Sequence, residues 1–276
     1  MTAAIVAEAH PLDAIIRADR MPHIWCPGCG IGIAMRCYAQ AILESGISTE
    51  RHIVVSGIGC SGRVAGYMAL DSYHTTHGRA IPFATGMKLA NPDLMVTVFS
   101  GDGDLAAIGG NHLIHAARRN VDIKVICVNN FNYGMTGGQF GPTTPIGARA
   151  TTAPYGNPEQ PFNLPSLLAA AGANYVSRWT TLHARQAKQD ILTAFGKPGF
   201  AFIEILSPCP VGFGKSNGID DGLEEMELYR ARCVIADGVS HEDLGIDLRS
   251  DRPIYIGNFI NRNLPPYQPI PPEALA

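Results

Sequence analysis

The sequence predicts an α/β fold in which a doubly wound parallel sheet carries helices on both faces. Two observations lead to this fold class. Short apolar runs that end in or beside glycine recur along the chain, and such runs are typical of parallel strands that are buried on both sides. Segments with a helical spacing of their apolar residues lie between these runs. Strands that alternate with helices in this way indicate a parallel sheet.

The expected elements follow one another along the chain. Each predicted strand is one of the apolar runs, and these cover residues 52–59, 94–104, 121–130 and 199–206. The helical patterns cover residues 30–45, 105–118, 163–171 and 181–195. Gly46 is expected to end the first helix, because glycine is common just after the last helical turn.

Two segments lack a regular pattern. Residues 131–160 are rich in glycine, threonine and proline, and a loop of this length inside a compact domain is usually functional. The tail from residue 250 is rich in proline and is predicted to be an arm on a partner surface. We therefore expect an N-terminal extension (1–20), a main domain (21–215), and a C-terminal helix and proline-rich arm (216–276) that packs on this domain or on a partner subunit.

Composition restricts the function classes. The chain has 276 residues, of which 46% are hydrophobic and 16% are charged. This charged fraction is well below the roughly 25% of an average soluble protein, which suggests that much surface is buried against another subunit. A net charge of −3 gives no sign of a nucleic-acid or anionic-lipid partner.

The sequence also predicts a compartment. No apolar run reaches the roughly 18 residues of a membrane span, and the first residues lack the basic and apolar segments of a signal peptide. We therefore expect a cytoplasmic protein. In the cytoplasm its seven cysteines are expected to be thiols or metal ligands rather than disulfides.

The motif WCPGCG at residues 25–30 places Cys26 and Cys29 three positions apart. This spacing fits a redox dithiol, half of a zinc site or part of an iron–sulfur site. Cys60 and Cys209 each adjoin the end of a predicted strand, so they can meet the first pair on one side of the sheet. The residues alone leave structural zinc and an iron–sulfur cluster open.

A second motif runs from GDG at 101–103 to NN at 129–130, with twenty-five residues between them. Asp102 and Asn130 follow two strand ends that border the usual ligand crevice of a parallel sheet. The Gly-rich turn and the helix after it present backbone N–H groups to phosphate. Oxygen ligands suit Mg²⁺, which often bridges protein and phosphate. Each half alone is a common turn or loop, but together they favour binding of a diphosphate.

This stretch resembles the thiamine diphosphate motif, in which GDG is followed by NN at a similar distance. The sequence NNFNYGMTGGQ narrows the resemblance to the β subunit of the 2-oxoacid:ferredoxin oxidoreductases. WCPGCG, GIGCSGR, HTTHGRAIPFATGMKLANPDL and SPCP fit that family in the same order. The resemblance covers about residues 20–215 and implies a sheet of the thiamine diphosphate-binding (PP-domain) type.

The resemblance implies that four cysteines from three segments hold a [4Fe–4S] cluster. These are Cys26, Cys29, Cys60 and Cys209. The remaining cysteines are expected to be core residues. They are Cys37 in a helix, Cys127 in a strand and Cys233 in a late helical pattern.

The resemblance also implies which residues hold the cofactor. Mg²⁺ would be bound by Asp102, Asn130 and the backbone carbonyl of Asn132, while Gly103 and Asp104 would hold the diphosphate. The expected cofactor contacts are Ile58, Gly59, Cys60, Ser61, His77, Gly101, Gly103, Asp104, Gly134, Met135 and Thr136, with Gly134 and Met135 beneath the thiazolium ring.

His77 is one of two candidate catalytic residues. A histidine in a loop is commonly a surface or packing residue, but the resemblance places His77 against the cofactor or the substrate. The other histidines of these segments, His74, His112 and His115, are given no role.

The resemblance implies oxidative decarboxylation of a 2-oxoacid. Thiamine diphosphate supplies the carbanion chemistry, the cluster removes electrons one at a time, ferredoxin accepts them, and coenzyme A takes the acyl group. Thiamine sites lie between two domains and need a carboxylate from the second one. Only one such domain is found here, so we expect an α subunit and an α₂β₂ assembly. The rival functions are a non-oxidative thiamine decarboxylase and a zinc-stabilised binding subunit.

Arg63 is the second candidate catalytic residue and carries the expectation about the substrate. It lies three residues after Cys60, in a segment expected to border the thiazolium ring. A guanidinium group there could bind a distal carboxylate by charge-assisted hydrogen bonds, although an exposed arginine or one paired with an aspartate is the plainer reading. Among 2-oxoacids this favours 2-oxoglutarate, with succinyl-CoA as product, and pyruvate is the alternative.

Overall fold

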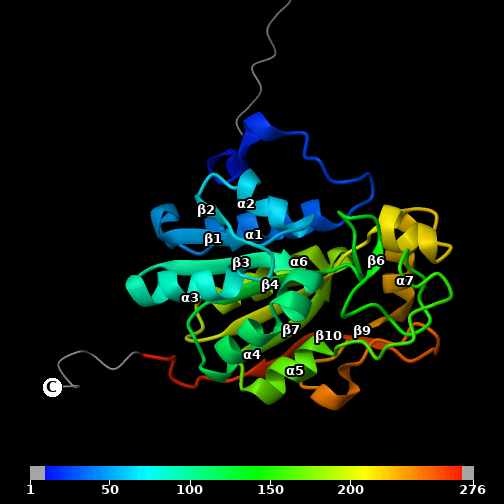
Figure 1. Cartoon of the computed structure of the whole chain (residues 1–276). Helices are drawn as coiled ribbons and strands as arrows, with labels where there is room; N and C mark the ends of the chain where they lie inside the picture. Colours follow the sequence, from blue (N-terminus) through cyan, green and yellow to red (C-terminus); the bar gives the residue numbers. More distant parts are fainter. Residues whose placement is uncertain (1–9, 269–276) are drawn as a thin grey trace, which may run out of the picture.

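An eight-stranded sheet forms the centre of the structure, and the computed structural model describes residues 10–268 (Figure 1). The strand order is β2-β1-β3-β4-β8-β7-β10-β9. Neighbouring strands are parallel except for β10, which is antiparallel to β7. The strands are β1 (His52–Ser56), β2 (Asp71–His74), β3 (Met95–Gly101), β4 (Lys124–Asn129), β7 (Tyr175–Thr180), β8 (Ala201–Leu206), β9 (Cys233–Ile235) and β10 (Ile254–Asn261).

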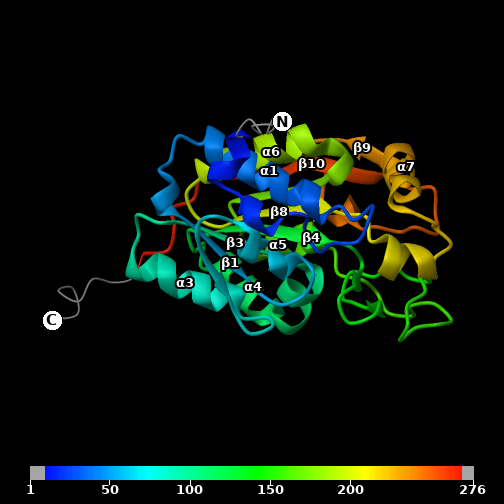
Figure 2. The same cartoon turned by 90° about the horizontal axis from the view of Figure 1, so that it is seen from above.

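Helices cover both faces of this sheet. Helices α1 and α6 pack on one face, and α3, α4 and α5 pack on the other (Figures 1 and 2). The helices are α1 (Ile31–Glu44), α2 (Val64–Tyr67), α3 (Ala80–Ala90), α4 (Gly110–Arg118), α5 (Leu164–Ala171), α6 (Ala184–Phe195) and α7 (Gly222–Arg232). A two-stranded hairpin, β5 (Asn132–Tyr133) and β6 (Gln139–Phe140), lies outside the sheet. This is the predicted doubly wound architecture.

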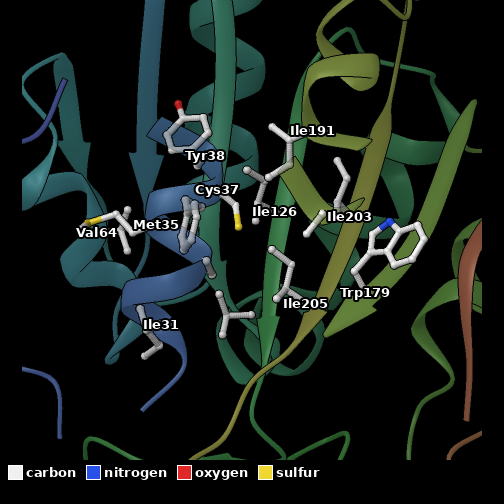
Figure 3. Packing of buried hydrophobic residues seen from close by; sticks show 14 of the residues in the cluster. Ile31, Met35, Cys37, Tyr38, Val64, Ile126, Trp179, Ile191, Ile203 and Ile205 are labelled. Atoms are coloured by element: carbon white, nitrogen blue, oxygen red, sulfur yellow. The ribbon is translucent and has the colours of Figure 1, made fainter. Parts of the chain in front are cut away.

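The central strands are apolar because each of their faces meets a layer of helices. In β4, Ile126 and Val128 belong to the core under α1 and α6, while Val125 and Cys127 belong to the core under α3 and α4. Figure 3 shows the first of these cores, where Tyr38 and other α1 side chains meet the sheet. Side chains alternate across a strand, so a strand buried on both faces has no polar position in its sequence pattern.

The structure contains elements that were not predicted, including β2, α3 and β7, and it departs from the prediction in three of the segments that were assigned. The predicted helix 105–118 begins instead as a π-helical turn at Gly103–Ile108, and α4 starts only at Gly110. The proline-rich tail contains strand β10, which extends the sheet by pairing with β7. Cys233 is the first residue of β9 rather than part of a helix, because α7 ends at Arg232.

The chain after β10 lies on its own domain as far as residue 268. The Asn120 side chain donates to the carbonyl oxygens of Leu264 and Pro265 at 3.2 and 2.8 Å. The backbone N–H of Tyr267 donates to the Asn120 carbonyl at 3.0 Å. At the other end, Ile15 is fully buried in the main core. The rest of the predicted extension and arm, residues 1–9 and 269–276, lies outside the described residues.

The parallel strands bring several predicted site segments to one edge of the sheet. Strands β1, β3, β4 and β8 all point the same way, so the loops that follow them emerge together. These loops contain the GIGC, GDG, NN and SPCP motifs. None of the helices within residues 10–268 is long and apolar enough to cross a membrane.

Candidate functional site

A cleft opens at the carboxyl ends of β1, β3 and β4, beneath the β5–β6 hairpin. Every residue that the sequence analysis expected to contact the cofactor or Mg²⁺ lines this cleft, and Tyr133 lines it as well. The lining residues are Ile58, Gly59, Cys60, Ser61, His77, Gly101, Asp102, Gly103, Asp104, Asn130, Asn132, Tyr133, Gly134, Met135 and Thr136.

Three oxygen atoms converge at the base of the cleft. The side-chain oxygen of Asn130 lies 2.8 Å from the backbone carbonyl oxygen of Asn132 and 3.3 Å from Oδ1 of Asp102. Turning the amide by 180° would instead let its NH₂ group donate to both. That turn of the amide, or a cation between the oxygens, would satisfy all three atoms. Neighbouring ligands of octahedral Mg²⁺ at 2.0–2.1 Å lie about 2.9 Å apart, so this spacing fits the ion.

Burial makes the Asp102 carboxylate depend on such a partner. It raises the pKa of Asp102 to about 7, and a hydrogen bond from the Thr143 hydroxyl opposes that shift.

The Asn132 carbonyl is turned toward the site by an unusual backbone conformation. Phe131 has φ of 60°, which a bulky residue rarely adopts unless its surroundings hold it there. Two hydrogen bonds provide that support. The Phe131 N–H donates to the side-chain oxygen of Asn129, and the Thr144 hydroxyl donates to the Phe131 carbonyl.

Asp104 lines the cleft, and its buried side chain joins the loops after β1 and β2 to the end of β3. Its Oδ1 accepts hydrogen bonds from the backbone N–H groups of Ile58 and Gly78, at 3.0 and 2.8 Å, and from Nδ1 of His77 at 2.5 Å. Its Oδ2 accepts from Ser100 at 2.8 Å. The carboxylate fits here because residue 57 is glycine, where a β carbon would lie 2.0 Å from it. The Asp104 side chain is therefore a structural anchor, and only its backbone remains to meet a phosphate.

The four predicted cluster cysteines line one cavity next to this cleft. Cys26, Cys29, Cys60 and Cys209 come from the WCPGCG turn and from the loops after β1 and β8. Two hydrogen bonds hold these segments together. The Trp25 indole N–H donates to the Cys60 carbonyl at 2.9 Å, and the Gly30 backbone N–H donates to the Pro208 carbonyl at 3.2 Å. The folded chain thus brings together residues up to 183 positions apart in sequence.

Burial makes two of these thiols hard to ionise. Burial raises the pKa of Cys29 to about 12 and that of Cys60 to about 11, and the neighbouring cysteines add to both shifts. Positive charge from a bound metal is what would reverse such shifts. Within residues 10–268 no three His, Cys, Asp or Glu side chains converge on a point that would hold a single metal ion. The cavity that the four thiols line together with nine other residues has a volume of about 190 Å³.

The cleft and the cysteine cavity share a wall that is one residue thick. Cys60, Asn130, Gly134 and Met135 line both. A β carbon added to Gly134 would lie 3.4 Å from Sγ of Cys209 and 3.7 Å from Sγ of Cys60. A molecule in the cleft and a group in the cavity would therefore be immediate neighbours.

Residues 57–205 match the family model "Thiamine pyrophosphate enzyme, C-terminal TPP binding domain". The chain is 59% identical over 208 residues to "2-oxoglutarate synthase subunit KorB" of Methanocaldococcus jannaschii, a match that covers 75% of this chain and 77% of that one. It is 44% identical over 188 residues to "2-oxoacid:ferredoxin oxidoreductase subunit beta" of a Sulfolobus species, covering 67% of this chain and 62% of that one.

The chain belongs to the β-subunit family of the 2-oxoacid:ferredoxin oxidoreductases.

A solved member of this family has the same fold. The structure of "2-oxoglutarate:ferredoxin oxidoreductase from Magnetococcus marinus with 2-oxoglutarate, coenzyme A and succinyl-CoA bound" superposes with a TM-score of 0.83 at 32% identity. The match covers 94% of this chain and 88% of that one. The family resemblance and the α/β fold class drawn from the sequence are confirmed, and this β subunit carries a thiamine diphosphate-binding domain.

Two features of this β subunit's site were missed from its sequence. Tyr133 lines the cleft, and its ring occupies the space beside Gly103, where a β carbon would lie 2.2 Å from the ring. Thr143 bonds to Asp102 from 41 residues away. Tyr133 could have been noticed because it is an aromatic residue within the NNFNYG motif. Nothing in the local sequence identifies Thr143.

Arg63 is not among the residues that line the cleft. It lies two residues after Ser61, which does line it, and the Arg63 backbone N–H donates to the Cys60 carbonyl at 3.3 Å. Its side chain is exposed at the start of α2. In the part of the chain that the structure describes, it forms no ion pair with an aspartate or glutamate.

A larger cavity of about 520 Å³ lies behind Asp102. A buried ion pair between Arg178 and Glu204, at 2.6 Å, lines it. Thr143 and Asn129 line it too and separate it from Asp102. We place the functional site in the smaller cleft because the GDG and NN residues and the cysteine cavity converge there.

Proposed function

We propose that this chain is the β subunit of a 2-oxoglutarate synthase. The enzyme would convert 2-oxoglutarate and coenzyme A to succinyl-CoA and CO₂ and pass two electrons through a [4Fe–4S] cluster to ferredoxin. The observation that carries this proposal is the shared wall at Gly134, where a thiamine-type cleft adjoins four thiols. The names of the relatives support the choice of substrate.

The donor atoms of the cleft fit Mg²⁺ and a diphosphate. Asp102, Asn130 and the Asn132 carbonyl would hold the ion, which would link the diphosphate to the protein. The backbone N–H groups at the start of the π-helical turn after Asp102 would face the phosphates. When bound, thiamine diphosphate supplies a carbanion that attacks the 2-oxo carbon. The protein's part is to hold the cofactor beside the cysteine cavity.

An iron–sulfur cluster would give the four cysteines a role in the reaction that a zinc ion would not. A [4Fe–4S] cluster takes four thiolates, and all four thiols line one cavity beside the cleft, where a cluster could accept the electrons of the oxidation. Cys26 is exposed, whereas Cys29, Cys60 and Cys209 are half-buried. The cluster would therefore face the cofactor on one side and solvent, where ferredoxin can approach, on the other.

A spectroscopic assay of the α–β complex tests the proposed function. The complex is purified without oxygen and supplied with Mg²⁺ and thiamine diphosphate. We expect 2-oxoglutarate to bleach the visible absorption of the cluster and, with coenzyme A and ferredoxin, to give succinyl-CoA. Release of CO₂ and an aldehyde without electron transfer would instead identify a non-oxidative decarboxylase.

The β chain alone is expected to be inactive. Its cleft is built from one cofactor-binding domain, and the exposed side chains of Ile58 and Met135 at its mouth suit a partner that covers them. We expect an α subunit to supply the opposite wall and the activating carboxylate, in an α₂β₂ assembly. Ferredoxin reduction with 2-oxoglutarate is measured for each subunit separately and for the mixture. Turnover by the isolated β chain would contradict this prediction.

Arg63→Leu is expected to lower kcat/KM for 2-oxoglutarate by about 10- to 150-fold. We expect Arg63 to bind the distal carboxylate of the substrate, and a hydrogen bond to a charged group contributes about 1.5–3 kcal/mol. A 2-oxoacid with an apolar tail should be much less affected. Steady-state kinetics with both substrates measure the difference.

The matched control is Arg36→Leu, which removes an exposed arginine from α1. We expect this variant to leave both substrates unaffected. Equal losses for both substrates in Arg63→Leu would mean that Arg63 serves the fold or the cofactor. A wild-type preference for pyruvate would show that the substrate assignment is wrong.

A further inference from the structure

His77 and Asp104 form a hydrogen-bonded pair that opens onto the cleft. Nδ1 of His77 lies 2.5 Å from Oδ1 of Asp104. The side chain of Asp104 is 1% exposed and that of His77 is 35% exposed. Because a carboxylate only accepts hydrogen bonds, the hydrogen between them belongs to Nδ1. In the neutral ring Nε2 is then an acceptor, and His77, whose other ring nitrogen is bound to Asp104, is one of the residues that line the cleft.

Asp104 cannot move with the ring, because other groups fix it. The Ile58 and Gly78 N–H groups bond to the same oxygen that faces His77, and Ser100 bonds to the other. These donors come from the loops after β1 and β2 and from the end of β3. A fixed carboxylate that orients an imidazole is the arrangement that prepares histidine to accept a proton.

We propose that His77 is the general base that removes the thiol proton of coenzyme A, with Asp104 as its positioning residue. This inference rests on the proposed function. In the step, the S–H bond breaks and its proton moves to Nε2. The sulfur electron pair forms the new C–S bond to the acyl carbon, and the bond that joins the acyl carbon to the cofactor would break, with its electron pair returning to the cofactor as the leaving group. The two electrons of the oxidation leave through the cluster to ferredoxin, and the proton passes from His77 to solvent.

The chemistry of the lining singles out His77 for this task. A thiol has an ordinary pKa of about 8.5, so most of it is protonated at neutral pH and needs a base. Each of the other ionisable residues in the lining already has a partner or is protonated at neutral pH. Asp102 faces the proposed Mg²⁺, Cys60 the proposed cluster, and Asp104 is enclosed by its four donors. Tyr133 has its pKa raised by burial and by the two aspartates, so at neutral pH it is a donor.

The variant His77→Asn distinguishes the roles of the two ring nitrogens. The asparagine amide nitrogen lies near the position of Nδ1, so it can keep the bond to Asp104, while the acceptor at Nε2 is lost. The assay uses the α–β holoenzyme in a stopped-flow instrument. Bleaching of the cluster by 2-oxoglutarate without coenzyme A reports the steps before the thiol, and succinyl-CoA formation reports the thiol step.

We expect the coenzyme A-dependent rate of His77→Asn to fall by about 10²- to 10⁴-fold, the usual contribution of a general base, and the bleaching rate to fall far less. An unchanged coenzyme A-dependent rate would overturn the proposal. Equal losses in both phases would also overturn it, because His77 would then serve the cofactor or the 2-oxoacid. A wild-type complex that 2-oxoglutarate does not bleach would refute the proposed function itself, before any variant is compared.

Asp104→Asn tests the positioning role without disturbing the fold. Two backbone N–H groups keep the amide oxygen toward His77, and the NH₂ group can donate to Ser100, so all four hydrogen bonds persist and only the charge is lost. We expect the coenzyme A-dependent rate to fall at least tenfold more than the bleaching rate. A purely structural Asp104 would leave both rates unchanged, which would remove it from the pair.

The position of the proton gives a readout independent of activity. Neutron diffraction or ¹⁵N NMR of the histidine-labelled complex should show the hydrogen of neutral His77 on Nδ1, in the wild type and in Asp104→Asn. A hydrogen on Nε2 in the wild type would leave no acceptor facing the cleft and would contradict the assignment.

Discussion

Asp102→Ala is expected to abolish binding of Mg²⁺ and thiamine diphosphate together. Asp102 is the charged member of the three-oxygen group at the base of the cleft, and it is 2% exposed. Removing one partner of a buried charge pair costs about 3–5 kcal/mol, which corresponds to about two to four orders of magnitude in affinity. Isothermal titration of the metal-free complex with the cofactor, with and without Mg²⁺, measures this loss.

Asp102→Asn provides the matched control for shape. It keeps the side-chain volume and an oxygen that can accept from Thr143, so a strong loss here would arise from the charge. Neither variant is expected to lower the melting temperature of the metal-free protein, because an unpaired buried carboxylate does not stabilise the fold. Tight cofactor binding that persists in Asp102→Ala, or in EDTA, would contradict the proposed metal site.

Cys209→Ala is expected to remove the cluster and all electron transfer to ferredoxin. We expect the wild-type complex to be brown, with about four irons per β chain. Cys26→Ala should have the same effect, because a cluster of this type takes a thiolate at each corner. Iron and sulfide assays together with the visible spectrum measure the loss.

Cys127→Ala is the control for this prediction. Cys127 is fully buried in β4 and belongs to the core on the opposite side of the sheet from α1. Its replacement should leave the iron content unchanged. A colourless wild-type protein that holds one zinc through the same four cysteines would refute the cluster assignment and favour a zinc-stabilised subunit.

The residues that end strands were predictable because the fold places strand ends together. A GDG or NN motif that follows an apolar strand lies at the carboxyl edge of a parallel sheet, so the positions of Asp102 and Asn130 could be predicted from the sequence. The same reasoning brought Cys60 and Cys209 to one side. In these cases the chemistry of each residue is set by its position along its own strand.

Contacts made across the fold were not predictable in the same way. The Asp104 side chain bonds to Ile58 and His77, 46 and 27 residues away, and these contacts were not predicted. Strand β7 was missed because Arg178 interrupts its apolar pattern. That arginine is buried only because Glu204 on the neighbouring strand pairs with it. Each of these outcomes depends on a partner that local spacing does not reveal.

The single-residue wall at Gly134 gives the proposed electron path a direction. An electron leaving the cleft would tunnel across the width of one glycine to reach sulfur on Cys60 or Cys209, far less than a typical distance between redox centres. It would leave through Cys26, the exposed member of the four cysteines. We therefore expect turnover to depend on the chemistry in the cleft or on the arrival of ferredoxin at Cys26 rather than on the distance between cleft and cavity.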